Sequence, residues 1–171
     1  MIENEKFGAE YRFELVRNGV VVDEWVQRNI APTQGRNHIL DVVLNGASPV
    51  TAWHVGLYGG DYTPIATDTM ANFPALASEI TAYVSTTRAP LVTASASAGV
   101  VSNIASRAEF EFTADATVRG GFISSSSVKG GTSGVLLSAA RFLDGAGAPI
   151  SKVVASGDVL RVTAGISLES T

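Results

Sequence analysis

The sequence predicts an all-β fold, an antiparallel β-sandwich or jelly-roll-like domain with one short helix. Short apolar segments alternate with polar residues along much of the chain, and Gly- or Pro-containing turns separate them. The run Gly120–Leu136 joins two apolar stretches through a loop of Ser and Gly that is almost free of charge. Only one stretch has sustained helical periodicity. The 171 residues suit a single compact domain, so we expect residues 1–171 to form one.

The amino-terminal part predicts an arm followed by a β-hairpin. Residues 1–7 are expected to form a flexible arm, because Met1–Lys6 is polar and acidic. Tyr11–Gln27 is expected to form the hairpin, since Asn18-Gly19 suits the two positive-φ positions of a two-residue turn. This turn sets a register of opposed pairs: Tyr11 with Val26, Leu15 with Val22, Val16 with Val21, and Glu14 with Asp23. The last pair joins like charges and therefore predicts an exposed face.

A helix and a long irregular segment are expected next. Thr33 is the predicted cap of a helix that ends at Asn45-Gly46, with Gly35 in its first turn. The apolar positions of this helix are Ile39, Leu40, Val43 and Leu44. After a strand at Ala52–Tyr58, residues 59–78 show no sustained period, apart from one helical turn that Asp68–Phe73 could form. Irregular segments of this length often contact another molecule, so we expect this one to reach a neighbour.

The remaining strands are short and regularly spaced. We expect them at Glu79–Ser85, Ala89–Ser95, Ala105–Thr113, Val118–Ser124, Gly134–Phe142 and Asp158–Leu168. Alternation is clearest in the third and in the last of these strands, where apolar side chains occupy every second position. The apolar sides of the strands predict core positions at Trp53, Phe110, Phe112, Leu160 and Val162.

Charge and composition argue against several classes of function. The net charge is −4 and the Lys and Arg residues are scattered singly, so nucleic-acid binding gains no support. Cysteine is absent, which excludes disulfides and thiolate chemistry. We expect no signal peptide and no membrane partner, because Met1–Lys6 is acidic and no apolar run approaches the ~20 residues that span a bilayer. Only 16% of residues are charged, which favours a surface partly covered by copies of the chain or by a partner.

The histidines and two aspartates are the first candidates for a metal site. His38 and His54 lack the spacing of a zinc site, which needs three or four close ligands. Asp61 and Asp68 could supply calcium ligands, but their spacing matches no EF-hand. We expect no metal and no cofactor.

Three further groups resemble catalytic motifs only in part. Ser124–Ser127 lacks a nucleophile elbow and a base, and Gly130–Gly134 lacks the Lys-Ser/Thr pair and the helix of a phosphate-binding loop. Glu109 and Glu111 share one strand face beside Arg107, which favours a solvated face over a glycosidase pair. We therefore expect no catalytic residues and no enzymatic activity.

Several separated motifs occur in order between Asn29 and Thr163. They are Asn29-Ile30 with Gly35 and Ile39-Leu40-Asp41, Trp53-His-Val-Gly-Leu57, Asp68-Thr-Met70, Glu79-Ile-Thr-Ala-Tyr83, Gly120-Gly-Phe122, Lys129-Gly-Gly-Thr132 and Ser156-Gly-Asp158. In order and spacing they resemble a family of small virion-associated proteins encoded among the structural genes of tailed bacteriophages. The resemblance implies a virion component made in the host cytoplasm, in particular a capsid decoration (cement) protein that stabilises the head lattice.

Two function hypotheses follow. In the first, the chain decorates the capsid, with the major capsid protein or another virion structural protein as partner, and assembles as a homo-oligomer. A trimer is expected because a capsid lattice offers three-fold points. In the second, the chain is a tail or fibre component that binds a host surface glycan through exposed aromatics such as Tyr58, Tyr62 and Trp53. Trp53 alternates with Val55 and Leu57, however, which favours a place in the core.

Overall fold

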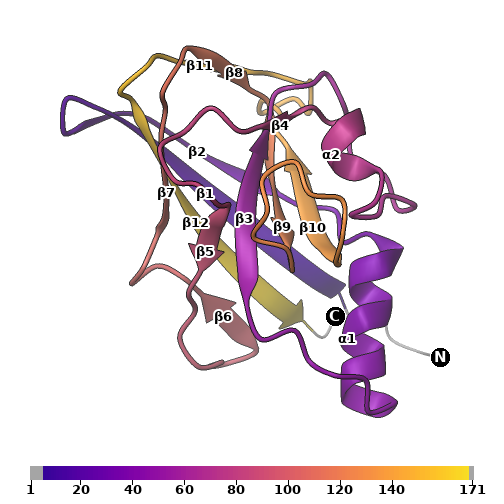
Figure 1. The fold of residues 1–171 in the computed structure, drawn as a ribbon. Helices are drawn as coiled ribbons and strands as arrows, with labels where there is room; N and C mark the ends of the chain where they lie inside the picture. The colour runs from indigo at the N-terminus through magenta and orange to yellow at the C-terminus, as the bar shows by residue number, and fades with distance from the viewer. Residues whose placement is uncertain (1–5, 170–171) are drawn as a thin grey trace.

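The computed structural model describes residues 6–169, which form an antiparallel β-sandwich with two helices (Figure 1). Sheet A has the order β2-β1-β12-β6, with β7 also paired to β12. Its strands are β1 (Lys6–Arg17), β2 (Val20–Arg28), β6 (Val100–Ser102), β7 (Ala108–Glu111) and β12 (Val159–Glu169). The ladder between β1 and β12 runs from Lys6 opposite Glu169 to Val16 opposite Val159.

Sheet B has the order β10-β9-β3-β4, with β5 also paired to β3. Its strands are β3 (Trp53–Tyr58), β4 (Glu79–Ile80), β5 (Ala89–Leu91), β9 (Gly120–Ser124) and β10 (Leu136–Arg141). A separate pair joins β8 (Ala116–Val118) to β11 (Lys152–Val154). Every ladder is antiparallel, which confirms the predicted all-β class.

The main core lies between the two sheets. Sheet A contributes Phe110, Leu160 and Val162, and sheet B contributes Val55 and Leu57, all of them fully buried. These residues occupy alternate positions along their strands, so one face of each strand supplies the core. The predicted core position Phe112 is also buried, whereas Trp53 is only partly buried and packs at the margin.

The irregular segment 59–78 covers the outer face of sheet B. Met70, Phe73 and Ala77 are fully buried there against Tyr58 and Phe122 of the sheet. The short helix α2 (Phe73–Leu76) lies within this segment, slightly later than the helical turn expected from the sequence. The segment therefore buries apolar side chains against its own sheet, which gives its length an internal explanation.

Helix α1 (Thr33–Leu44) lies where the sequence predicts a helix, but it meets the sheet differently. Pro32 is the N-cap residue and no side chain caps the helix, so the predicted capping by Thr33 is wrong. Gly35 is the buried residue of α1, and a Cβ there would lie 2.6 Å from the Leu137 carbonyl oxygen of β10. The helix thus contacts β10 through a residue without a side chain. Three of its apolar positions are instead exposed: Leu40, Val43 and Leu44.

The β1–β2 hairpin has the predicted turn but a shifted register. Asn18 and Gly19 have φ values of 51° and 77°, as a two-residue hairpin turn requires. Val16 pairs with Val21 as predicted, and a bulge then moves every later pair by one residue. The observed pairs are Leu15 with Asp23, Glu14 with Glu24, Arg12 with Val26 and Tyr11 with Gln27. The predicted pairs of Leu15, Glu14 and Tyr11 are therefore wrong.

Glu14 lies on the outer face of sheet A among exposed residues such as Arg12 and Glu24, as its like-charge pair predicts, but its own side chain is covered. Its opposite residue, Glu24, is again a like charge, yet Glu14 is only 8% exposed. Arg107 donates to Glu14 at 2.9 Å, and Arg12 lies 2.7 Å from Glu24. Each carboxylate therefore has an arginine as counter-ion, and only that of Glu14 is covered.

Other boundaries differ from the predicted strands. The predicted strand at Glu79–Ser85 is only two residues long, and Val118–Ser124 is divided between β8 and β9. The sequence pattern did not reveal β6 and β11. Strand β1 begins at Lys6, so the rest of the predicted arm, residues 1–5, lies outside the described residues. Within residues 6–169, neither helix has the length and apolar character that crossing a membrane requires.

An ion pair fixes the start of β12 to the hairpin. Asp158 is buried, and Arg17 donates to its two carboxylate oxygens at 2.8 and 2.6 Å. The Arg17 hydrogen bond, aided by the backbone N–H of Ala155, lowers the pKa of Asp158 below its ordinary value of about 3.9.

This ion pair predicts a loss of stability in acid. A carboxylate with a lowered folded-state pKa stabilises the fold above its unfolded pKa, and that contribution disappears as the pH falls through the folded pKa. Asp158→Asn should therefore show a smaller drop in the free energy of unfolding between pH 5 and pH 3 than wild type, measured by urea unfolding at each pH. An unchanged pH dependence would contradict this role of Asp158.

Candidate functional site

Charged side chains concentrate on the outer face of sheet A. Three ion pairs cross its strands there: Arg12 with Glu24 at 2.7 Å, Arg107 with Glu14 at 2.9 Å, and Arg161 with Glu109 at 2.8 Å. They connect β2, β1, β12 and the residues around β7. This is a solvated, ion-paired face, as predicted for Glu109, whose partner is Arg161.

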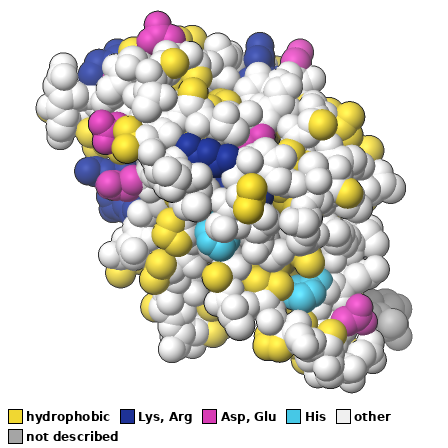
Figure 2. Space-filling model, in the orientation of Figure 1, with side chains coloured by type: hydrophobic (Ala, Val, Ile, Leu, Met, Phe, Trp, Pro, Cys, Tyr) yellow, Lys and Arg dark blue, Asp and Glu magenta, His cyan; other side chains and the backbone are white. Residues whose placement is uncertain are grey.

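The opposite side of the sandwich presents a different surface. Figure 2 shows histidine, hydrophobic and uncharged side chains over most of its lower half. Charged side chains lie mainly along the top and the left edge, with a basic group above the centre and an acidic group at the lower right. We call this surface the neutral face and define it by α1, β3, β5 and the loop Ser125–Gly134. Its exposed apolar side chains include Leu40, Val43, Leu44 and Val128, all at least 53% exposed.

A shallow groove of about 180 Å³ lies on the neutral face, between α1 and β3. Its lining is mostly apolar and consists of His38, Ile39, Val42, Val43, Pro49, Val50 and Trp53. The rings of His38 and Trp53 meet edge to face, 5.8 Å apart, and form the aromatic part of the wall. The groove offers apolar contact area with few polar groups, as in the centre of a protein interface.

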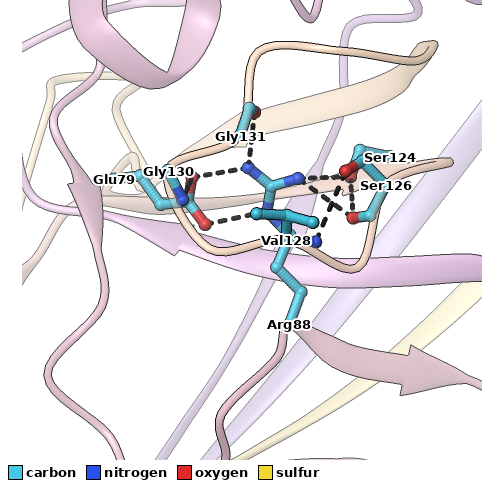
Figure 3. Close-up of polar contacts among 7 residues, drawn as sticks. All are labelled: Glu79, Arg88, Ser124, Ser126, Val128, Gly130 and Gly131. Atoms are coloured by element: carbon cyan, nitrogen blue, oxygen red, sulfur yellow. Dashed lines mark hydrogen bonds and ion pairs between the residues drawn. The ribbon is translucent and has the colours of Figure 1, made fainter.

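The loop beside the groove is fixed by a buried arginine (Figure 3). Arg88 is completely buried and donates to both carboxylate oxygens of Glu79, at 2.8 and 2.6 Å. It also donates to Ser124 Oγ at 3.3 Å, and to the carbonyl oxygens of Ser126 and Gly131 at 3.0 Å each. All five N–H groups of the guanidinium therefore have an acceptor.

Further contacts complete this arginine clamp, which we define as Arg88, Glu79 and the loop groups that they bind. The backbone N–H of Gly130 donates to Glu79 at 2.9 Å, and the backbone N–H of Arg88 donates to the Ser127 carbonyl at 2.8 Å. Lys129 donates to the Thr81 and Tyr83 carbonyls and lies 3.6 Å from the centre of the Tyr83 ring. A loop of Ser and Gly is thereby held at both of its ends, with Val128 60% exposed on it.

His54 is the second residue of β3 and lies next to the clamp, opposite Ser124 of β9. Burial, and secondly the nearby positive charge of Arg88, lower the pKa of His54 below its ordinary value of about 6.5. The imidazole is therefore neutral at pH 7 and adds no charge to the neutral face.

The two aspartates considered as calcium ligands have other partners. Asp68 is buried and accepts hydrogen bonds from the Tyr62 hydroxyl at 2.7 Å and from the Ile65 N–H at 2.8 Å. Asp61 is exposed and pairs with Arg141 at 2.5 Å. Across residues 6–169, no three His, Cys, Asp or Glu side chains gather as metal ligands would.

The remaining candidate residues have structural contacts. Ser124–Ser127 and Gly130–Gly134 belong to the clamped loop, and Glu111 is exposed on sheet A. The expected aromatic platform is wrong for Tyr58, which is completely buried in the second cluster. Sequence reasoning assigned no role to Arg88 and noted Glu79 only as the first residue of the Glu79–Tyr83 motif, because an isolated Arg and Glu nine residues apart do not indicate a buried ion pair.

Comparison with known proteins assigns the chain to no family. No protein-family model matches the chain, and no curated protein matches it either. The likeness to virion proteins of tailed phages, noted from the sequence motifs, therefore stays a prediction.

Proposed function

We propose that this chain is a structural protein of a tailed-phage virion that decorates the capsid through its neutral face. The observation that carries the proposal is the segregation of charge between the two sides of the sandwich. Sheet A carries the ion-paired outer face, whereas the neutral face combines an apolar groove with a clamped loop. The sequence motifs that resemble phage virion proteins supply the class of partner, namely the major capsid protein or another virion structural protein.

The chemistry of the neutral face suits attachment to a protein lattice. Burial of uncharged side chains avoids the desolvation cost of charges, and the apolar groups gain free energy from leaving water. The arginine clamp orders the loop before binding, so less conformational entropy is lost on attachment. A decoration protein needs this binding and no chemistry, and in the proposed complex the charged face of sheet A would remain in water.

The glycan-binding alternative gains less support. Of its three proposed aromatic residues, Tyr58 is buried, and Tyr62 packs against Phe73 and donates its hydroxyl to Asp68. Trp53 alone lines the groove on the neutral face. A carbohydrate platform normally presents an accessible ring face together with polar groups, and this groove has few polar groups.

A charge placed on the neutral face tests the proposal. Val43 is 72% exposed at the groove, so Val43→Lys should leave the fold intact and weaken binding to capsids of the parent phage by about tenfold or more. Val153→Lys is the matched control, since Val153 is 70% exposed on β11, far from α1 in Figure 1. Co-sedimentation with capsids stripped of the protein measures both affinities.

The location of the protein on intact particles is the second test. Electron microscopy of labelled particles should show density on the head between capsomers. Density restricted to the tail tip would support the glycan-binding alternative, and equal capsid affinity of both Lys variants would remove the neutral face from the proposal.

A further inference from the structure

Strand β2 is an open edge of sheet A. Its only ladder within residues 6–169 is with β1, on one side, so the backbone groups of the other side have no strand partner there. Strand β10, at one edge of sheet B, is not open in the same way. Its residue Ala139 exchanges two backbone hydrogen bonds with Ile30, at 2.9 and 3.0 Å. An open edge that is nine residues long is a template for pairing with another strand.

The ladder shows which residues of β2 point their backbone groups outward. Asn29 donates to the Ala9 carbonyl at 3.0 Å, so hydrogen-bonded positions recur at every second residue back along β2. Residues 25 and 27 are therefore bonded to β1, while the N–H and C=O groups of Glu24, Val26 and Arg28 point away from it. These three residues are exposed and contain no Pro or Lys that would block an added strand.

We propose that two copies of this chain associate by antiparallel pairing of their β2 strands about a two-fold axis at Val26. This register puts Val26 against the partner's Val26, and both Val side chains, 47% exposed in one chain, are covered. It also puts Glu24 against the partner's Arg28, and Arg28 against the partner's Glu24. Arg28 forms no ion pair with the other described residues, and the pairing supplies it with one.

The charge pattern selects this register over its neighbours. With the axis at Glu24, two carboxylates would lie directly opposite, which destabilises a strand pair. With the axis at Trp25, Glu24 would face the partner's Val26, and Arg28 would face the partner's Val22. Only the register centred on Val26 joins opposite charges at both ends. The bulge near Val21 and Asp23 ends the regular edge toward the hairpin tip.

This inference stands apart from the proposed capsid binding, since β2 belongs to sheet A and the neutral face to the opposite side. A two-fold pair also differs from the trimer that the sequence predicts. Sedimentation velocity over a concentration series should give a reversible species of twice the 17.8 kDa chain mass. A strictly monomeric or a trimeric mass overturns the inference.

Variants of the edge test the register. Val26→Pro removes an outward N–H without breaking the ladder to β1, so it should abolish the pair, whereas Val26→Thr should keep it. Arg28→Glu should weaken the pair by about tenfold or more, and adding Glu24→Lys should restore it. Within one chain these two residues lie roughly 13 Å apart along the strand, so rescue requires contact between copies.

Two outcomes overturn this register. One is a Val26→Pro protein that is folded by circular dichroism and associates as wild type does. The other is an Arg28→Glu protein whose association Glu24→Lys does not restore. If Val26→Pro fails to fold, this second result alone tests the register.

Discussion

Replacing Arg88 with Met is expected to lower the free energy of unfolding by about 3–5 kcal/mol. Arg88 is completely buried, and the side chain of its partner Glu79 is only 2% exposed, so the substitution leaves a carboxylate without its counter-ion. The Gly131 carbonyl loses its Arg88 donor at the same time, and the Ser126 carbonyl keeps only the Ser124 hydroxyl. Urea unfolding followed by fluorescence measures the loss. Arg36→Met is the control, since Arg36 is exposed, and it should change stability by no more than about 0.5 kcal/mol.

A double variant separates charge from loop geometry. Arg88→Met with Glu79→Met leaves no buried charge, so it should be more stable than Arg88→Met alone. The loop should nonetheless exchange its amide hydrogens faster than in wild type, because it has lost its anchoring donors. If the two substitutions simply add, the ion pair is not what stabilises this region, and our account of the clamp fails.

Truncating Phe110 to Ala is expected to cost a similar amount, about 3–5 kcal/mol. Phe110 is completely buried between the sheets, and its ring meets Tyr83 edge to face at 5.0 Å. The change would leave a cavity that the strands of both sheets cannot close. Thermal and urea unfolding give the loss, with Val153→Ala as the exposed control. A stability close to that of wild type would show that the facing of β7 is misassigned.

The strand pattern was predictable wherever it is a local property of the sequence. Asn18-Gly19 identifies its hairpin, and the alternation along Val159–Glu169 identifies the inward side chains Leu160, Val162 and Ala164. The alternation no longer predicts burial at the end of the strand, where Leu168 is 60% exposed although it falls on the apolar side. No local pattern tells how far the opposite sheet extends.

Features that depend on distant neighbours could not be predicted. Gly35 falls in the first turn of the predicted helix, and the sequence does not show that the backbone of β10 lies against it. The bulge that shifts the hairpin register has no signature in the side chains around Val22. These positions are set by tertiary packing, which overrides local preference.

For the candidate site, the sequence predicted the kinds of residue at the surface but not where they lie. A charged fraction of 16% predicted some neutral surface, but not which side of the molecule carries it. The serines and glycines of the loop predicted a turn, and the structure adds Arg88 as the residue that orders it. Five acceptor atoms, two on Glu79 and three within residues 124–131, meet one guanidinium, and only the folded chain brings these segments together.

The ladder between β1 and β12 has a consequence for how the chain folds. It joins Lys6 to Glu169, so the centre of sheet A forms between segments that lie more than 140 residues apart in sequence. At about 5–20 residues per second, a ribosome needs on the order of ten seconds to make β12 after β1 has emerged. During that interval the hairpin has no neighbour on the β1 side, and sheet A forms late and slowly, as expected for a topology of high contact order.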